Sequence, residues 1–228
     1  MGQTMAGAYV FVADVERPAL AAEDRHHLER VLRLRPGDAV TVSDGAGRWR
    51  PCRYGPGPRP ELAPDGDVVV APAPAPPIAV AFALTKGQKP ELAVQKLTEL
   101  GADRIIPFAA ARSVVRWTDP ARHVERLRRV AHEAACQSRR AWLPVVEDPT
   151  TFGALARRAG ATLADRAGGP PTLAPLVLVG PEGGWAPEEL ASGLPRMGLG
   201  PHVLRAETAS ITVGALLAAL RAGLVAPG

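Results

Sequence analysis

Two glycine-rich loops near the C-terminus have the clearest chemical character in this chain. The first, GPEGGW over 180–185, follows the apolar run Leu176–Val179, and the second lies in LGPHVLRAETA over 199–209. Glycine has no Cβ, so its backbone accepts positive φ and lets a ligand approach the peptide N–H and C=O groups. A single glycine after a strand can equally do no more than make a turn. Two such loops close together favour a pocket for a flat ligand such as adenine.

The first loop differs from the common phosphate-binding motifs. It lacks the lysine followed by serine or threonine that ends a P-loop, and Glu182 would repel a nucleoside triphosphate. No G-x-G-x-x-G motif stands between a strand and a helix. A neutral or cationic ligand fits better. S-adenosylmethionine, with its sulfonium charge, is one such ligand, although the loop composition alone does not select it.

Several stretches, taken together and in order, resemble one known family. They are RHHL (25–28), VLRL (31–34), PGD (36–38), DG (44–45), KGQKPELAVQKLTELGADRIIPFAAARSVVR (86–116), GPEGGW and LGPHVLRAETA. They are similar to the ribosomal RNA small-subunit methyltransferase E family, which belongs to the SPOUT class. The resemblance implies S-adenosylmethionine as methyl donor, N3 of a uridine in 16S ribosomal RNA as acceptor, and a homodimer.

The resemblance and the loop pattern together predict the residues of the cofactor pocket. We expect this pocket to use residues of the strand before the first loop, of both loops and of the helix start that follows: Leu178, Gly180, Glu182, Gly183, Gly184, Leu199, Gly200, Leu204, Arg205 and Ala209. No metal is expected. Glu207 precedes Thr208 at a predicted helix start, where an acidic side chain favours the helix dipole.

Arg140 and Glu182 are the expected catalytic residues. Methylation at N3 requires loss of the imide proton, which a base can accept or a nearby cation can favour by stabilising the uridine anion. A carboxylate of ordinary pKa is a poor base for this proton, so we expect arginine to contribute more to the reaction. EAACQSRR over 133–140 resembles the family motif E-A-x-E-Q-x-x-R with Cys136 in place of the glutamate, which favours Arg140 over Arg139. Glu182 could instead bond to loop N–H groups or cap the helix near Pro187.

Basic side chains on predicted helices and loops are candidates for RNA contacts. In the region from 121, arginines recur at i, i+4 and i+7 and so form one stripe on a helix. A solvated helix face is the ordinary explanation of such a pattern, and the resemblance favours RNA. The candidates are His26, Arg30, Arg33, Lys86, Arg112, Arg116, Arg122, Arg126 and Arg129.

The charge is unevenly distributed along the chain. Net charge is −1 through Pro72 and +5 after it, and 24 of the 27 basic residues are arginine, which suits phosphate contacts. Cys52 and Cys136 have no metal-ligand spacing and are predicted to be free thiols. No apolar run is long enough to span a membrane, and no signal-peptide pattern begins the chain, so we expect a cytoplasmic protein.

A proline-rich segment over 73–77 divides the chain into two predicted domains. Residues 1–72 are expected to form a small β-rich domain, with strands near 8–15 and 68–70, a helix over 21–34 and a hairpin over 39–54. The resemblance implies a PUA-like RNA-binding fold for it. Residues 78–228 alternate between strand and helix patterns, which predicts an α/β domain with a mostly parallel sheet. The expected strands are 78–84, 104–108, 176–179 and 202–204, and the expected helices are 91–100, 121–140, 152–158 and 208–224.

The SPOUT resemblance adds a C-terminal trefoil knot, which general chain topology would not suggest. The residues leave two other functions open. One is methylation of another RNA atom, such as a ribose 2′-hydroxyl. The other is a non-catalytic RNA-binding or ribosome-assembly factor that has kept the fold.

Overall fold

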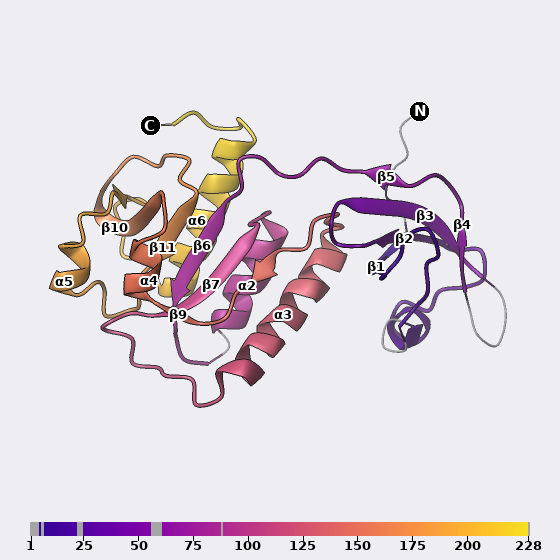
Figure 1. The fold of residues 1–228 in the computed structure, drawn as a ribbon, viewed down its shortest axis with the longest axis horizontal. Coiled ribbons are helices and arrows are strands. Elements are labelled where there is room, and N and C mark those ends of the chain that lie inside the picture. Colours follow the sequence, from indigo (N-terminus) through magenta and orange to yellow (C-terminus); the bar gives the residue numbers. More distant parts are fainter. Residues whose placement is uncertain (1–4, 6, 22–24, 56–60, 88, 228) are drawn as a thin grey trace. The chain divides into compact units, whose positions relative to one another are not determined.

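The computed structural model describes residues 5, 7–21, 25–55, 61–87 and 89–227, which fold as two compact units (Figure 1). The first unit comprises Met1–Ala73 and Ala135–Leu143. The second comprises Pro74–Ala134 and Pro144–Gly228. The segment 135–143, which the sequence pattern places inside the second domain, therefore packs with the first unit.

A five-stranded sheet forms the first unit. The hairpin expected around Asp44 and Gly45 is present, and the Asp44 carboxylate accepts hydrogen bonds from the N–H groups of Ala46 at 2.7 Å and Arg48 at 3.0 Å. The first two strands are parallel and the other pairs are antiparallel. The strands are β1 (Ala8–Phe11), β2 (Ala39–Ser43), β3 (Arg48–Tyr54), β4 (Leu62–Pro64) and β5 (Val69–Val70).

The helix predicted over 21–34 is much shorter in the described part of the chain. A π-helical turn, η1 (His27–Val31), follows a short helical stretch at 25–26, while residues 22–24 lie outside the described residues. Arg33 has a φ of 52°, a left-handed conformation that ends the helical path. Leu28 is fully buried, whereas Leu32 is 46% exposed.

The segment 135–143 closes over the β2–β3 hairpin of the first unit. Trp142 lies against Gly47, where a Cβ would come within 2.5 Å of the indole ring, and its Nε1 donates to the carbonyl of Ala71 at 3.2 Å. The Tyr9 hydroxyl donates to the carbonyl of Arg140 at 2.8 Å. Any side chain at Gly47 would collide with the indole, so the hairpin and this segment require glycine there.

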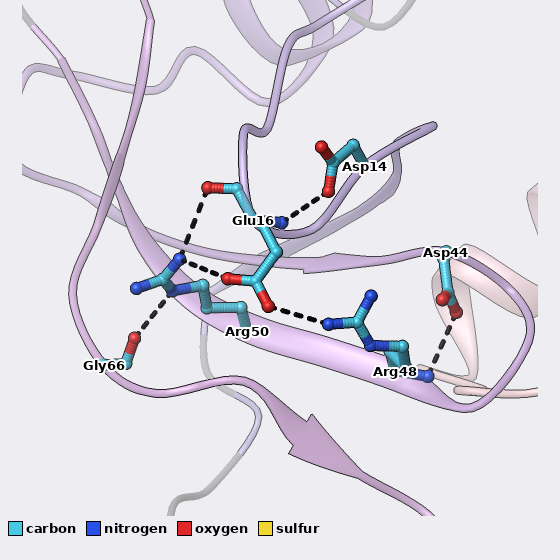
Figure 2. A network of polar contacts seen from close by, with 6 residues as sticks. All are labelled: Asp14, Glu16, Asp44, Arg48, Arg50 and Gly66. Atoms are coloured by element: carbon cyan, nitrogen blue, oxygen red, sulfur yellow. Dashed lines mark hydrogen bonds and ion pairs between the residues drawn. The ribbon is translucent and has the colours of Figure 1, made fainter.

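Glu16 contacts two arginines of β3 in a polar network, which Figure 2 shows. Its carboxylate lies 2.8 Å from Arg48 and 3.6 Å from Arg50, and Arg50 also donates to the carbonyl of Gly66 at 2.7 Å. The Glu16 N–H is held by the Asp14 carboxylate at 2.8 Å. These arginines are therefore engaged within the first unit itself.

The second unit contains a seven-stranded sheet in which every pair of neighbouring strands is parallel. The strand order is β12-β10-β11-β6-β7-β8, with β9 also paired to β7. The expected mostly parallel α/β fold is thus confirmed. The strands are β6 (Ala79–Ala83), β7 (Arg104–Ala109), β8 (Val145–Val146), β9 (Thr150–Thr151), β10 (Ala161–Gly169), β11 (Leu176–Val179) and β12 (Arg196–Met197).

Helices cover both faces of this sheet because its central strands are apolar on both sides. Side chains such as Val80, Ile105 and Val177 pack on one face with α2 (Lys89–Glu99), α3 (Pro120–Gln137) and α6 (Ala206–Arg221). Ala81, Ile106 and Leu178 lie on the other face, toward α4 (Phe152–Ala156) and α5 (Pro187–Leu190). Gly214 lets α6 approach α2, because a Cβ there would come within 2.6 Å of Leu97.

In the second unit one predicted strand was wrong and one long strand was missed. Residues 202–204 form a loop instead of a strand, and Val203 in that loop is 81% exposed. The longest strand of this unit, β10, was not predicted at all, since ATLADRAGG shows neither a long apolar run nor a clear alternation. No helix among the described residues is long and apolar enough to cross a lipid bilayer.

Candidate functional site

A cavity of about 310 Å³ lies where the carboxyl ends of β10 and β11 meet the two glycine-rich loops. Parallel strands deliver their following loops to one edge of the sheet, which is where α/β proteins bind ligands. The loop after β11 contributes residues from 180–185, and the second loop contributes residues from 199–204. The first residues of α6 complete the wall.

The structure brings together most of the residues predicted for this pocket. Gly180, Glu182, Gly184, Leu199, Gly200, Leu204 and Ala209 line the cavity. Three others lie elsewhere. Leu178 is fully buried in β11 as part of the core, Arg205 is the exposed residue before α6, and the carbonyl of Gly183 accepts a hydrogen bond from Arg112 at 3.1 Å.

Further residues line the cavity that the sequence pattern did not indicate. Asp165 and Arg166 come from β10, the strand that was not predicted, and Trp185 directly follows the glycines. His202 and Val203 belong to the loop that was predicted as a strand. The signal that could have pointed to β10 is its polar pair, Asp165 and Arg166, directly after the short apolar stretch 161–164.

Glu182 forms an ion pair with Lys89, the first residue of α2. Lys89 Nζ lies 2.7 Å from Glu182 Oε1 and 3.7 Å from Glu207 Oε2. The hydrogen bond from Lys89 lowers the pKa of Glu182, and the same bond raises the pKa of Lys89. Glu182 is therefore an anion held beside the pocket, and a lowered pKa makes it a weak proton acceptor. Glu207 lies in the first turn of α6, as expected.

Glu189, which the sequence analysis did not single out, holds the first glycine-rich loop in place. This carboxylate is 3% exposed, and its oxygens accept from the N–H groups of Ala111 at 2.8 Å and Ala186 at 2.9 Å. It thereby caps α5, the role considered for Glu182, and ties the end of β7 to the loop after β11. A buried carboxylate with two N–H donors rigidifies both segments.

Trp185 anchors the same loop from the other end. Its ring is buried and stacked on Phe108 with a centroid separation of 6.2 Å, and Nε1 donates to the carbonyl of Ala164 at 2.9 Å. Gly180 leaves room for this ring, since a Cβ there would lie 3.0 Å from the indole. Gly200 has a φ of 114°, a conformation that residues with a side chain rarely adopt.

The two predicted catalytic residues belong to different units. Glu182 lies in the second unit, whereas Arg140 lies in the segment 135–143 of the first. Arg139, which the sequence analysis set aside, has a φ of 54° and donates to the carbonyls of Met5 at 2.6 Å and Gly7 at 3.0 Å. Its side chain therefore holds the backbone at Met5 and Gly7 within the first unit.

The predicted RNA contacts are exposed in both units. In the first unit, Arg33 lies beyond η1 and so does not continue the helical face of His26 and Arg30. In the second unit, Arg126 pairs with Glu91 at 3.1 Å. The exposed residues are His26, Arg30, Arg33, Lys86, Arg112, Arg116, Arg122, Arg126 and Arg129.

The described part of the chain contains no evident set of metal ligands. There, no group of three or more His, Cys, Asp or Glu side chains is arranged to hold an ion. Neither Cys52 nor Cys136 forms a disulfide.

Comparison of the sequence with known proteins identifies the family of this chain. A profile described as an RNA methyltransferase domain matches residues 72–218, and one described as an RNA methyltransferase PUA domain matches residues 20–57. Ribosomal RNA small subunit methyltransferase E of Mycobacterium bovis is 37% identical over 230 residues, which cover 85% of this chain and 83% of that protein. This chain belongs to the ribosomal RNA small subunit methyltransferase E family.

Solved structures show the same fold as this methyltransferase E family member. A Legionella pneumophila protein described as a methyltransferase in complex with S-adenosylmethionine has a TM-score of 0.81 and 25% identity, covering 94% of this chain and 98% of its own. Ribosomal RNA small subunit methyltransferase E from Neisseria gonorrhoeae, bound to S-adenosylmethionine, has a TM-score of 0.77 and 23% identity over 95% and 98% of the two chains. The methyltransferase E fold thus spans both units.

Proposed function

We propose that this protein transfers a methyl group from S-adenosylmethionine to N3 of a uridine in 16S ribosomal RNA. The observation that carries the proposal is the cavity built from the two glycine-rich loops, in a chain whose relatives are small-subunit ribosomal RNA methyltransferases. We place the reaction in the cytoplasm, where small-subunit RNA would be the substrate.

The residues of the cavity suit S-adenosylmethionine. Glycines at 180, 184 and 200 leave peptide groups accessible to an adenine edge, and Leu199 and Leu204 provide apolar surface for its ring. Glu182 and Glu207 place two carboxylates beside the single ammonium of Lys89, so acidic groups are in excess there. This excess favours a sulfonium and disfavours a polyphosphate. When bound, this cofactor supplies an electrophilic methyl group.

The chain's own residues have two tasks in this reaction. They must orient the uracil ring so that N3 points at the methyl donor, and they must favour the uracil anion that remains when the imide proton leaves. Glu182 is a poor acceptor for that proton, because its pKa is lowered by Lys89. We therefore assign Glu182 to holding the cationic donor, and Arg140 to stabilising negative charge on the uracil. The proton then passes to solvent.

We propose a homodimer and a knotted C-terminal region as parts of the same function. The chain leaves β11, runs through α5 to β12 on the far side of β10, and returns to the cavity before α6, a path that supports a knot. Val203, Leu224 and Val225 are exposed apolar side chains that a second subunit could cover. Light scattering after size-exclusion chromatography tests the dimer.

The decisive experiment is transfer of labelled methyl from S-adenosylmethionine to unmethylated small ribosomal subunits, followed by mass spectrometry of the nucleosides. We expect 3-methyluridine. A 2′-O-methylated nucleoside would show that the methyl acceptor is a ribose 2′-oxygen and not N3 of uridine. Absence of transfer to both subunits and naked RNA, from a protein that also fails to bind S-adenosylmethionine, would favour a non-catalytic RNA-binding factor.

Arg140 is tested by separating binding from turnover. Arg140→Lys keeps the charge but loses the planar guanidinium, and Arg140→Ala loses both. If Arg140 stabilises the uracil anion, both variants lower kcat more than they raise KM, and alanine is the more severe. Arg139→Lys is the adjacent control for the packing of segment 135–143. An Arg140→Ala enzyme with unchanged kcat would remove Arg140 from the mechanism.

A further inference from the structure

A second cavity, of about 250 Å³, lies in the second unit and shares no lining residue with the first. Its wall is formed by the loop after β6, the first turn of α2, the stretch before α3 and the first turns of α3. The lining residues are Thr85, Lys86, Gly87, Pro90, Glu91, Val115, Arg116, Trp117, Thr118, His123, Arg126 and Leu127. We call it the second cavity.

Two flat rings form part of its wall. Trp117 and His123 are stacked, with ring centroids 4.7 Å apart and planes within 15° of parallel. Both side chains are half-buried, and Trp117 packs against the core of the unit. A pair of rings fixed in this way offers a rigid π surface on which a nucleobase can stack, whatever its sequence.

The charged residues of the second cavity suit a phosphate near such a base. Lys86 and Arg116 are exposed, and neither has an acidic partner among the described residues. Arg126 differs, because its charge is already opposed by Glu91 at 3.1 Å. Lys86 and Arg116 can therefore both contact a phosphate, whereas the charge of Arg126 is already neutralised by Glu91.

Glu91 provides an acceptor in the same wall. One carboxylate oxygen, Oε1, binds Arg126, while the buried Oε2 has no hydrogen-bond partner in the structure. A buried acceptor without a donor is costly, and a base N–H or a ribose hydroxyl could satisfy it.

The segments that line the second cavity also contact the first glycine-rich loop. Lys86, in the loop after β6, lines the second cavity, while Lys89, the first residue of α2, pairs with Glu182 of the first cavity. In the stretch after β7, Arg116 lines the second cavity while Arg112 donates to the carbonyl of Gly183. An RNA strand whose target base approaches the methyl donor in the first cavity would therefore bring neighbouring nucleotides to these same segments.

We propose that the second cavity binds one single-stranded nucleotide of the RNA substrate, different from the nucleotide that is methylated. Its base stacks on the Trp117–His123 pair, and its phosphate lies between Lys86 and Arg116. This inference rests on the proposed function, because that function supplies the RNA. It assigns the second cavity the task of holding the strand in register with the methyl donor.

The test measures RNA affinity of the full-length protein by fluorescence anisotropy, with a labelled single-stranded fragment of small-subunit ribosomal RNA as probe. We expect Trp117→Ala to weaken binding on the order of tenfold, and Trp117→Phe to retain most of the affinity because a ring still stacks. Lys86→Ala and Arg116→Ala alter exposed side chains, so they test the phosphate contact without threatening the fold. Arg157→Ala removes an exposed arginine outside both cavities and should leave binding unchanged.

A photocrosslink makes the assignment direct. RNA containing 4-thiouridine should crosslink to the peptide that carries 115–123, and Trp117→Ala should abolish that product. Affinity for S-adenosylmethionine should be unchanged in the variant, which separates failure of the second cavity from failure of the proposed function. Wild-type affinity in Trp117→Ala, Lys86→Ala and Arg116→Ala, with crosslinks only outside 115–123, would overturn the proposal.

Discussion

At the scale of single residues, the ion pair of Lys89 and Glu182 controls the ionisation of the Glu182 carboxyl beside the first cavity. The hydrogen bond from Lys89 keeps the pKa of Glu182 below its ordinary value, so Glu182 stays ionised further into acid than a free carboxylate. In Lys89→Met the pKa of Glu182 should rise. The acid-side loss of S-adenosylmethionine affinity should then move to higher pH, as measured by calorimetric titration between about pH 4 and 7.

Lys96→Met is the matched control for this prediction. Lys96 lies on the same helix and pairs with Glu99 at 2.8 Å, and neither residue lines the first cavity. Its loss should leave the pH profile of cofactor affinity unchanged. An unshifted midpoint in Lys89→Met would show that Glu182 does not govern cofactor binding.

The two cysteines should differ in reactivity. Cys52 is 1% exposed in the core of the first unit, and burial raises the pKa of its thiol to about 11. Cys136 is only half-buried. Because the thiolate is the reactive form, an alkylating reagent near neutral pH should modify Cys136 first, with Cys52 reacting only when the first unit opens. Peptide mapping over a time course checks the order, and equal rates would contradict it.

At the scale of elements, one buried carboxylate links two loops. Glu189→Gln replaces an acceptor oxygen with an NH₂ group that faces a peptide N–H, so one of the bonds to Ala111 or Ala186 is lost. We expect a loss of about 1–3 kcal/mol in the free energy of unfolding and weaker cofactor binding. Urea denaturation and calorimetry measure the two effects.

Glu188→Gln is the control on the neighbouring position. Glu188 is exposed in the same turn of α5. Glu188→Gln therefore makes the same chemical change at the adjacent helix position and leaves the buried hydrogen bonds of Glu189 intact. It should shift stability by less than about 0.5 kcal/mol. If both variants behave alike, Glu189 does not position the loop.

The elements that the sequence predicted well share a strong local signal. Leu176–Val179 is a continuous apolar run before glycine, and its strand was predicted with the same bounds as β11. Residues of the two glycine-rich loops then followed as pocket candidates, and most line the first cavity. Residues of the second loop also line the first cavity, although 202–204 were predicted as a strand and form a loop.

The elements that escaped prediction depend on distant partners. Arg196 and Met197 form a strand only because β10 lies alongside, and β10 itself contains Asp165 and Arg166 where it reaches the cavity. Glu189 looked like an ordinary acidic residue of a short helix, yet it binds an N–H group 78 positions earlier. Contacts of this kind are set by tertiary packing, which local propensity does not encode.

At the scale of the whole molecule, the excess of basic residues should make RNA binding sensitive to salt. Each phosphate neutralised by an unpaired side chain adds about one to the slope of log affinity against log salt concentration. Arg122→Ala should reduce that slope by about one if Arg122 contacts phosphate. Arg126→Ala should reduce it less, because Glu91 already opposes its charge.

Anisotropy titrations at several potassium chloride concentrations give both slopes. Arg157→Ala is again the control, since this exposed arginine was not predicted to contact RNA. Equal slopes for Arg122→Ala and Arg157→Ala would remove the α3 stripe from the RNA-binding surface.

The return of segment 135–143 to the first unit affects how the chain is made. Trp142 packs on Gly47, and Leu143 N–H donates to the carbonyl of Gly45 at 2.9 Å, so the hairpin near the N-terminus uses partners almost a hundred positions later. A ribosome synthesising this chain would release residues 1–73 well before those partners emerge. The first unit therefore cannot complete its packing until much of the second has been translated. A fragment cut at the proline-rich linker would lack the contacts that segment 135–143 supplies.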